Sequence, residues 1–344
     1  MSDRNTIANR NIRYILVFAI LLMALLVTIV LNINIGNVSI TLSEIFGILS
    51  GRGAESSAYK IIWMIRLPRL IMAGMLGGAL AVSGILLQTY FGNPIAGPFV
   101  LGISSGAKFV VALNMIIFAN VYRGQSSWEM ILAAFLGAML ATFFIVIVSG
   151  YVKDAAGLLV AGIMIGYICS AATDFLLTFA EDSDIVNLRG WSMGSFSGMS
   201  WDNVRIAAFV ISISVLMTFM LSKPIGALQM GEGYARSMGV NVSVFRVVII
   251  VLSSVLSATV TAFAGPISFV GIAVPFLVKQ LLKTTKPMVV VPAVFLCGAF
   301  FTLMCDLIAR CVFAPTELNI STVTSIFGAP VVIFMLVSRR RRNG

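Results

Sequence analysis

Long runs of apolar residues without a single charge are the feature that most restricts how this chain can fold. The first run, 14–31, holds 18 uncharged residues, and a later one, 247–278, holds 32. A helix needs about 20 apolar residues to cross the hydrocarbon core of a bilayer. Only 10% of all residues are charged, whereas a soluble domain has about 25%. We therefore expect an integral membrane protein.

The apolar runs predict ten transmembrane helices. The 32-residue run is too long for one span, and Gly265-Pro266 divides it, because proline removes a backbone donor and disfavours helix in the residue before it. The predicted spans are 14–32, 68–90, 99–120, 129–152, 157–180, 206–222, 246–264, 268–283, 288–312 and 322–338. We expect an all-α polytopic membrane protein with a single transmembrane domain over residues 1–344.

Basic residues predict the orientation of the chain. An even number of spans places both termini on one side, and both terminal segments, 1–13 and 339–344, are rich in arginine. Because basic residues mark cytoplasmic segments, we expect both termini in the cytoplasm. No small-residue cleavage site follows the first run, so we expect a membrane helix there rather than a signal peptide.

The composition argues against enzymatic chemistry. The chain has no histidine, and its four cysteines show no C-x-x-C spacing, which excludes histidine-based metal sites and Ser-His-Asp triads. Segment 102–108 has three residues between its glycines, whereas a Walker phosphate loop has four, followed by Lys-Ser/Thr. The basic residues lie in short loops and form no face that could follow nucleic acid. We expect no catalytic site, no metal, no cofactor and no nucleic-acid partner.

Two arginine-rich segments lie at the predicted outer ends of spans. Arg66-Leu67-Pro68-Arg69 begins the second span, and segment 306–310 lies near the end of the ninth. Arginines at the membrane edge can simply extend toward water. The alternative is a stiff cationic patch around the proline, suited to bidentate capture of carboxylates from a soluble partner.

Glycine and proline also interrupt the helices at particular places. Gly74-x-x-x-Gly78 predicts close helix packing. Segment 92–98, rich in glycine and proline, breaks the chain after the second span, either as a surface turn or as part of a pathway lining. The longest predicted cytoplasmic loop, 222–245, predicts two short amphipathic helices, which would either lie on the membrane or insert into a cytoplasmic partner.

Taken together, these segments resemble the permease subunits of type II ABC importers for iron–siderophore, haem and cobalamin, the FecCD-like family. The likeness extends from about residue 60 to 338. Its order and spacing are specific although no single block is decisive. The segments that carry it are R-L-P-R at 66–69, A-L-A-V-S-G at 79–84, F-G-N-P-I-A-G-P at 91–98, L-G-I-S-S-G-A at 101–107, W-S-M-G-S-F-S-G-x-S-W at 191–201, G-E-G-Y-A-R-S-M-G-V at 231–240, G-P-I-S-F-V-G at 265–271, D-L-I-A-R at 306–310, P-T-E-L at 315–318 and G-A-P at 328–330.

The resemblance implies a permease that pairs with a second permease subunit, two cytoplasmic ABC ATPases and an extracellular or periplasmic substrate-binding protein. It also implies three sets of site residues. The residues implied for docking of the binding protein are Arg66, Arg69 and Arg310. Those implied for coupling to the ATPases are Gly231, Glu232, Ala235, Arg236 and Gly239. Those implied for the cytoplasmic gate of the pathway are Asn93, Pro94 and Ile95.

Two positions depart from the family pattern. Many relatives have aspartate where Gly97 stands, which puts a polar contact at the inner turn in doubt. Many also have histidine where Phe276 stands, which removes a titratable group near the inner end of the eighth span.

The functional expectation is an ATP-driven importer subunit in a bacterial cytoplasmic membrane. An iron–siderophore complex is the expected substrate, with haem or cobalamin as alternatives, and the chain could pair with itself or with a paralogue. A more remote alternative is an ion-coupled secondary transporter, which needs ionisable residues within the membrane. Only Asp174, Lys108 and Asp306 are candidates for that role.

Overall fold

The computed structural model describes residues 2–36, 57–118, 127–152 and 154–343, and within these ranges the chain is helical with no strand. In the first half lie α1 Ser2–Asn34, α3 Ser57–Lys60, η1 Ile61–Arg66, α4 Leu67–Phe91, η2 Pro98–Leu101, α5 Ile103–Leu113, η3 Asn114–Phe118, α7 Ser127–Tyr151 and α8 Ala155–Leu177. In the second half lie α9 Asp182–Ser192, α10 Trp201–Met220, α11 Ser222–Gln229, α12 Glu232–Ser237, α13 Val242–Ala264, α14 Val270–Leu282, α15 Pro287–Cys311 and α16 Ile320–Asn343.

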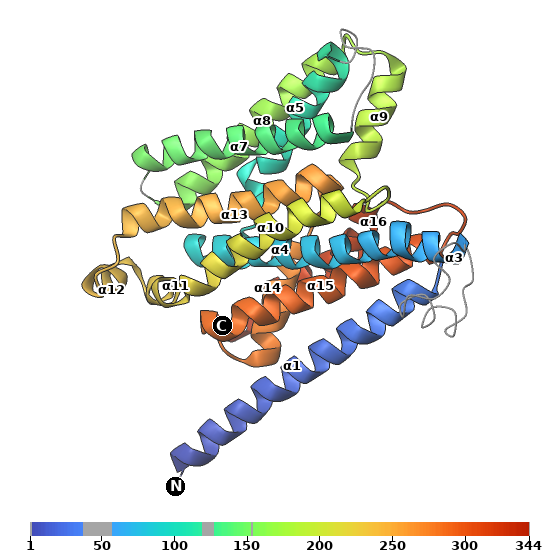
Figure 1. The fold of residues 1–344 in the computed structure, drawn as a ribbon. Helices are drawn as coiled ribbons and strands as arrows, with labels where there is room; N and C mark the ends of the chain where they lie inside the picture. Colours follow the sequence, from blue (N-terminus) through green and yellow to red (C-terminus); the bar gives the residue numbers. More distant parts are fainter. Residues whose placement is uncertain (1, 37–56, 119–126, 153, 344) are drawn as a thin grey trace.

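The long helices form a bundle whose centre is α4 (Figure 1). In the described ranges, eight helices are long and apolar enough to cross a membrane, and two shorter apolar helices, Ile103–Ile117 and Val270–Leu282, accompany them. Together these helices account for the ten predicted spans. Helices α1 and α8 lie on opposite sides of the bundle, while α11 and α12 lie at the end remote from α3 (Figure 1).

Close packing around α4 depends on a glycine that the predicted motif did not include. A Cβ added at Gly77 would lie 2.6 Å from the carbonyl oxygen of Gly298 on α15, so the two backbones are in contact there. At Gly74 the nearest atom would be a Leu303 side-chain carbon at 3.5 Å, which is an ordinary contact. Gly78, the second glycine of the predicted motif, is also tight, since a Cβ there would lie 2.6 Å from a ring carbon of Phe295 on α15. The predicted close face is therefore present at Gly78 and includes Gly77, opposite a glycine of the partner helix.

Buried hydroxyls reinforce these contacts between helices. Ser83 on α4 donates to the carbonyl oxygen of Ser253 on α13 at 2.8 Å. Thr302 on α15 donates to the carbonyl oxygen of Ala73 on α4 at 2.9 Å. Such bonds between helices are typical of membrane bundles, where lipid supplies no hydrogen-bonding partner.

The predicted break at Gly265-Pro266 is confirmed. Helix α13 ends at Ala264, Gly265 has a φ of +73°, and α14 begins at Val270 after Phe269, whose φ is 65°. A positive φ is strained for a residue with a side chain, and the backbone here is buried inside the protein. Non-helical backbone at membrane depth is tolerated only in such a setting.

The second and sixth spans begin well before their predicted starts, and one helix lies outside the predicted spans. The second span begins at Ser57 rather than 68, because a π-helical turn, η1, continues the helix ahead of Pro68. Helix α10 begins at Trp201 rather than 206. Helix α9 was not predicted, because its sequence is too polar to span a membrane. Asp182 and Asp184 in its first turn nevertheless favour a helix N-terminus.

Candidate functional site

The predicted docking arginines lie at the end of the bundle where α4 begins, and Arg69 is bound there by two carboxylates. Its Nη2 is 2.9 Å from an Asp306 oxygen and 3.0 Å from a Glu317 oxygen. Its Nη1 also donates to Glu317, at 3.1 Å. The Asp306 side chain is 2% exposed whereas that of Glu317 is 38% exposed. Arg69 therefore has one permanently buried partner and one that solvent and other molecules can reach.

Arg310 belongs to the same cluster. Its Nε lies 3.2 Å from the second Asp306 oxygen, one helical turn earlier on α15. It also donates to the side-chain oxygen of Asn32 on α1. The buried Asp306 carboxylate thus has an arginine on each side, and the cluster joins three helices.

Arg66 has a different environment from Arg69 and Arg310, although it lies close to Arg69 in the sequence. The side chain is buried and donates to the backbone carbonyls of Ile33 and Asn34, where α1 ends. The last carbonyls of a helix have no partner within the helix. Arg66 therefore caps the C-terminus of α1, and neither Arg66 nor Arg69 extends freely toward water.

The 222–245 loop forms two short helices, α11 and α12, as predicted. Gly231 and Gly239 have φ values of +111° and +82°, a conformation that glycine adopts without strain. Ala235 is fully buried and packs with Ala227 and Val242, so its side chain supports the loop from within and is not available to a partner.

The solvent-exposed surface of the 222–245 loop carries charged and apolar side chains. Glu232 is 3.0 Å from Arg246 on α13 and 3.6 Å from Arg236 on α12. Met230 and Met238 are exposed. Neither methionine was predicted as a contact residue, although flexible apolar side chains on a polar loop are typical of a contact surface.

The predicted gate residues form a tight turn directly after α4. The side-chain oxygen of Asn93 accepts a hydrogen bond from the backbone N–H of Ile95 at 3.2 Å, an arrangement that stabilises turns. Asn93 and Pro94 are half-buried, and Ile95 is exposed. The turn lies between α4 and η2.

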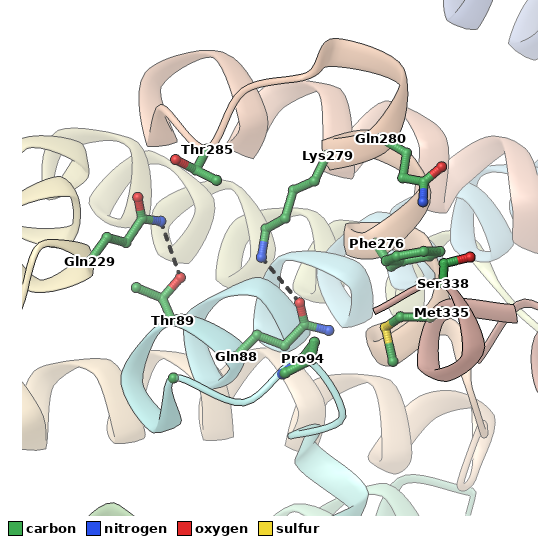
Figure 2. A pocket seen from close by; sticks show the side chains of 11 residues that line it. Gln88, Thr89, Pro94, Gln229, Phe276, Lys279, Gln280, Thr285, Met335 and Ser338 are labelled. Atoms are coloured by element: carbon green, nitrogen blue, oxygen red, sulfur yellow. Dashed lines mark hydrogen bonds between the residues drawn. The ribbon is translucent and has the colours of Figure 1, made fainter. Parts of the chain in front are cut away.

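A cavity of about 440 Å³ adjoins this turn (Figure 2). Its lining comes from the end of α4, the turn, α11, α14, the 283–286 connection and α16. Lys279 on α14 points across the cavity and donates to Gln88 at 3.3 Å, and Gln229 on α11 donates to Thr89 at 3.4 Å (Figure 2). The lining residues are Gln88, Thr89, Gly92, Pro94, Gln229, Phe276, Lys279, Gln280, Thr285, Met335 and Ser338.

Phe276, one of the two positions that depart from the family pattern, lies in the wall of this cavity. The Phe276 ring lines the cavity where many relatives would place an imidazole. Lys279, one helical turn further along α14, supplies a titratable group to the same cavity. The 222–245 loop and the turn after α4, which are far apart in sequence, both contribute to the lining, through Gln229 and Pro94.

Comparison with protein families decides what kind of protein this is. The model of the FecCD transport family matches residues 22–338. The chain belongs to this family. It is a multi-pass ABC importer permease, as the resemblance implied.

Individual relatives of this FecCD permease include proteins with a named substrate. The vitamin B12 import system permease protein BtuC of Klebsiella pneumoniae is 33% identical over 293 residues, covering 85% of this chain and 87% of the relative. BtuC of Escherichia coli O9:H4 is 32% identical over 333 residues, covering 96% of this chain and 97% of the relative.

Solved structures agree on the fold. An inward-facing structure described as a metal-chelate type ABC transporter matches with a TM-score of 0.83 and 25% identity, over 94% of this chain and 99% of that one. PsaBC from Streptococcus pneumoniae matches with a TM-score of 0.52 and 13% identity, over 86% of this chain and 95% of that one. The second likeness concerns the fold alone.

The three residues that were candidates for ion coupling lie in separate environments in this FecCD permease. Asp306 is neutralised by Arg69 and Arg310. Asp174 is exposed on the surface of α8, and Lys108 is half-buried on α5. A coupling site requires ionisable groups that line a shared intramembrane pathway, and these three lie on different helices without a mutual contact.

Proposed function

We propose that this permease forms the translocation pathway for a large metal chelate, and that a corrinoid of the vitamin B12 type is the first candidate substrate. The observation that carries the proposal is the match with vitamin B12 permeases, which extends over 96% of the chain. The expected iron–siderophore substrate becomes the second candidate. It is supported by the likeness to a metal-chelate type transporter, and both candidates are bulky complexes of a metal with an organic ligand.

The proposed assembly contains a second permease subunit, either another copy or a paralogue, two cytoplasmic ABC ATPases and a substrate-binding protein outside. Its place is the bacterial cytoplasmic membrane with both termini inside. The two proposed docking regions lie at opposite ends of the bundle, Arg69 near the start of α4 and Glu232 on α12 (Figure 1). Partners on opposite sides of a membrane require this arrangement.

The outer docking region is proposed to work by exchange of carboxylates. Arg69 keeps its bond to the buried Asp306 and can accept a carboxylate of the binding protein in place of Glu317, because the Glu317 side chain is 38% exposed. Bidentate arginine–carboxylate pairs give orientation as well as affinity. Arg66 contributes indirectly, by holding the end of α1 beside this region.

The inner docking region is proposed to receive the ATPases. Closure of the ATPase pair on ATP pushes on α11 and α12, and the gate turn at Asn93, Pro94 and Ile95 changes position as the bundles rock. The permease supplies no chemistry to this cycle. Hydrolysis of ATP in the partner subunits supplies the free energy.

Ligand binding by the cognate binding protein tests the substrate assignment. The substrate-binding protein that docks on this permease is purified and titrated separately with cyanocobalamin and with ferric siderophores, and quenching of its intrinsic fluorescence is measured. Saturable quenching by cyanocobalamin alone supports the corrinoid assignment. Quenching by a ferric siderophore alone contradicts it and restores the second candidate.

A further inference from the structure

Arg246 connects the proposed coupling loop to the helix that ends at the gate turn. It lies in the first turn and a half of α13, with a side chain that is only 12% exposed. Its Nη2 is 3.0 Å from a carboxylate oxygen of Glu232 on α12. On the other side, its guanidinium carbon lies 5.7 Å from the centre of the Tyr90 ring on α4, within the range of a cation–π contact.

Tyr90 is well placed to pass a displacement on to the turn. Tyr90 is the penultimate residue of α4, and its side chain is buried. Its ring packs edge to face on that of Phe91, with 4.8 Å between the ring centres. Gly92 follows with a φ of +59° and begins the turn. The backbone N–H of Ile95 donates to the Asn93 side-chain oxygen and stiffens that turn, so we expect a shift of Tyr90 to be passed to the turn.

Glu232 is held by two arginines, and only one of them reaches inward. Arg236 lies on α12 itself, 3.6 Å away, with a side chain that is 67% exposed. Arg246 is on a different helix, and its largely covered side chain lies between Glu232 and Tyr90. Another polar link from the loop to α4, the hydrogen bond from Gln229 to Thr89, is 3.4 Å long and exposed, so solvent weakens it.

The guanidinium of Arg246 is not fully satisfied in this arrangement. Its Nε is buried and has no hydrogen-bond acceptor among the described residues. A buried donor without an acceptor costs free energy, so the contacts that hold this guanidinium are the ion pair with Glu232 and the face of the Tyr90 ring.

We infer that Arg246 is the positioning residue that transmits movement of the coupling loop to the gate, through Glu232 on one side and Tyr90 on the other. The inference rests on the proposed function of the 222–245 loop. Displacement of α12 by an ATPase shifts Glu232, the ion pair carries Arg246 with it, and the guanidinium changes its position on the Tyr90 ring at the end of α4.

The test separates ATP hydrolysis from transport in the same vesicles. The full complex of permease, ATPases and binding protein is reconstituted in proteoliposomes, and phosphate release and uptake of the substrate identified by the binding protein are both measured. Arg246→Gln is expected to keep ATP hydrolysis near the wild-type rate while uptake per ATP falls at least about fivefold, the lower end of typical coupling between sites. Arg205→Gln, which removes an arginine from an exposed pair with Asp202, should leave uptake per ATP unchanged.

Variants of Tyr90 test the same path without altering a charge. Tyr90→Phe keeps the aromatic face and should retain uptake per ATP. Tyr90→Leu keeps an apolar side chain but removes the ring, and should lower uptake per ATP as Arg246→Gln does. This pair keeps the inference testable even where Arg246→Gln fails to assemble.

Three results would overturn the inference. Hydrolysis and uptake falling in parallel in Arg246→Gln would show that the residue only supports assembly with the ATPases. Equal uptake per ATP in Tyr90→Leu and wild type would remove Tyr90 from the path. Absence of ATP-driven uptake by the wild-type complex would instead contradict the proposed function itself, and the inference with it.

Discussion

The guanidinium of Arg69 on α4 lies 2.9 Å from the carboxylate of Asp306 on α15, although 237 residues separate them in the sequence. The Asp306 side chain is almost wholly buried, and Arg310 contacts it from the other side. This cluster fixes the relative position of α4, α15 and, through Asn32, α1. It gives the end of the bundle where docking is proposed a base that is tied together across three helices.

Removal of the buried carboxylate should destabilise the protein strongly. Asp306→Ala leaves Arg69 and Arg310 without their shared partner, and an uncompensated buried charge costs about 3–5 kcal/mol. Thermal unfolding in detergent measures the effect. Asp202→Ala, which breaks an exposed pair with Arg205, should cost less than about 1 kcal/mol. Equal melting temperatures for the two variants would show that the cluster contributes little.

Glu317 should compete with the binding protein for Arg69. Glu317→Gln removes the competing carboxylate and is expected to tighten docking by up to about fivefold, the scale of a partly exposed ion pair. Docking is measured by interferometry with the permease in nanodiscs. Asp202→Asn removes one negative charge from the same end of the bundle without touching Arg69, and should change affinity less. Weaker docking in Glu317→Gln would contradict exchange of carboxylates.

Backbone contact between α4 and α15 should make Gly77 intolerant of a side chain. Gly77→Ala places a Cβ 2.6 Å from the carbonyl oxygen of Gly298 and should cost about 1–3 kcal/mol, as overpacking typically does. Gly74→Ala, on the same helix, makes only ordinary contacts and should be nearly neutral. Chemical denaturation compares the two, and an equal cost would show that α4 and α15 readily move apart.

Exposed methionines should contribute to binding of the ATPases. Met238→Glu places a charge on the apolar surface of the loop and is expected to reduce co-purification of the ATPases more than about tenfold, as loss of a central interface residue does. Met238→Leu keeps the side chain apolar and should retain binding. Retention of the ATPases by Met238→Glu would place the contact elsewhere on the 222–245 loop.

The spans could be predicted from the sequence because lipid requires long apolar runs, and that requirement acts locally. The break at Gly265 and the two helices of the 222–245 loop follow from glycine and proline chemistry in the same local way. The π-helical turn η1 could not be predicted, because continuation of the helix across Pro68 depends on packing that no local pattern reports. Helix α9 was missed because its sequence is polar, although Asp182 and Asp184 in its first turn were a local signal for a helix.

The candidate sites were predictable as segments but not as contacts. The sequence motifs selected Arg66, Arg69 and Arg310, yet only the fold shows that Arg66 caps α1 while the other two share Asp306. The roles of Glu317 and Arg246 depend on side chains that meet across the bundle. Contacts between side chains on different helices leave no periodic pattern in the sequence. They can therefore be identified only when the positions of the helices are known.

Uptake into sealed vesicles tests the central claim most directly. The permease is reconstituted with its ATPases and the loaded binding protein, and labelled cyanocobalamin is followed with ATP inside the vesicles or with an imposed proton gradient and no ATP. We expect uptake with ATP and none with the gradient alone, and we expect uptake to stop when an ATPase unable to hydrolyse ATP replaces the active one. Uptake driven by the gradient alone would contradict the assignment as an ATP-driven importer.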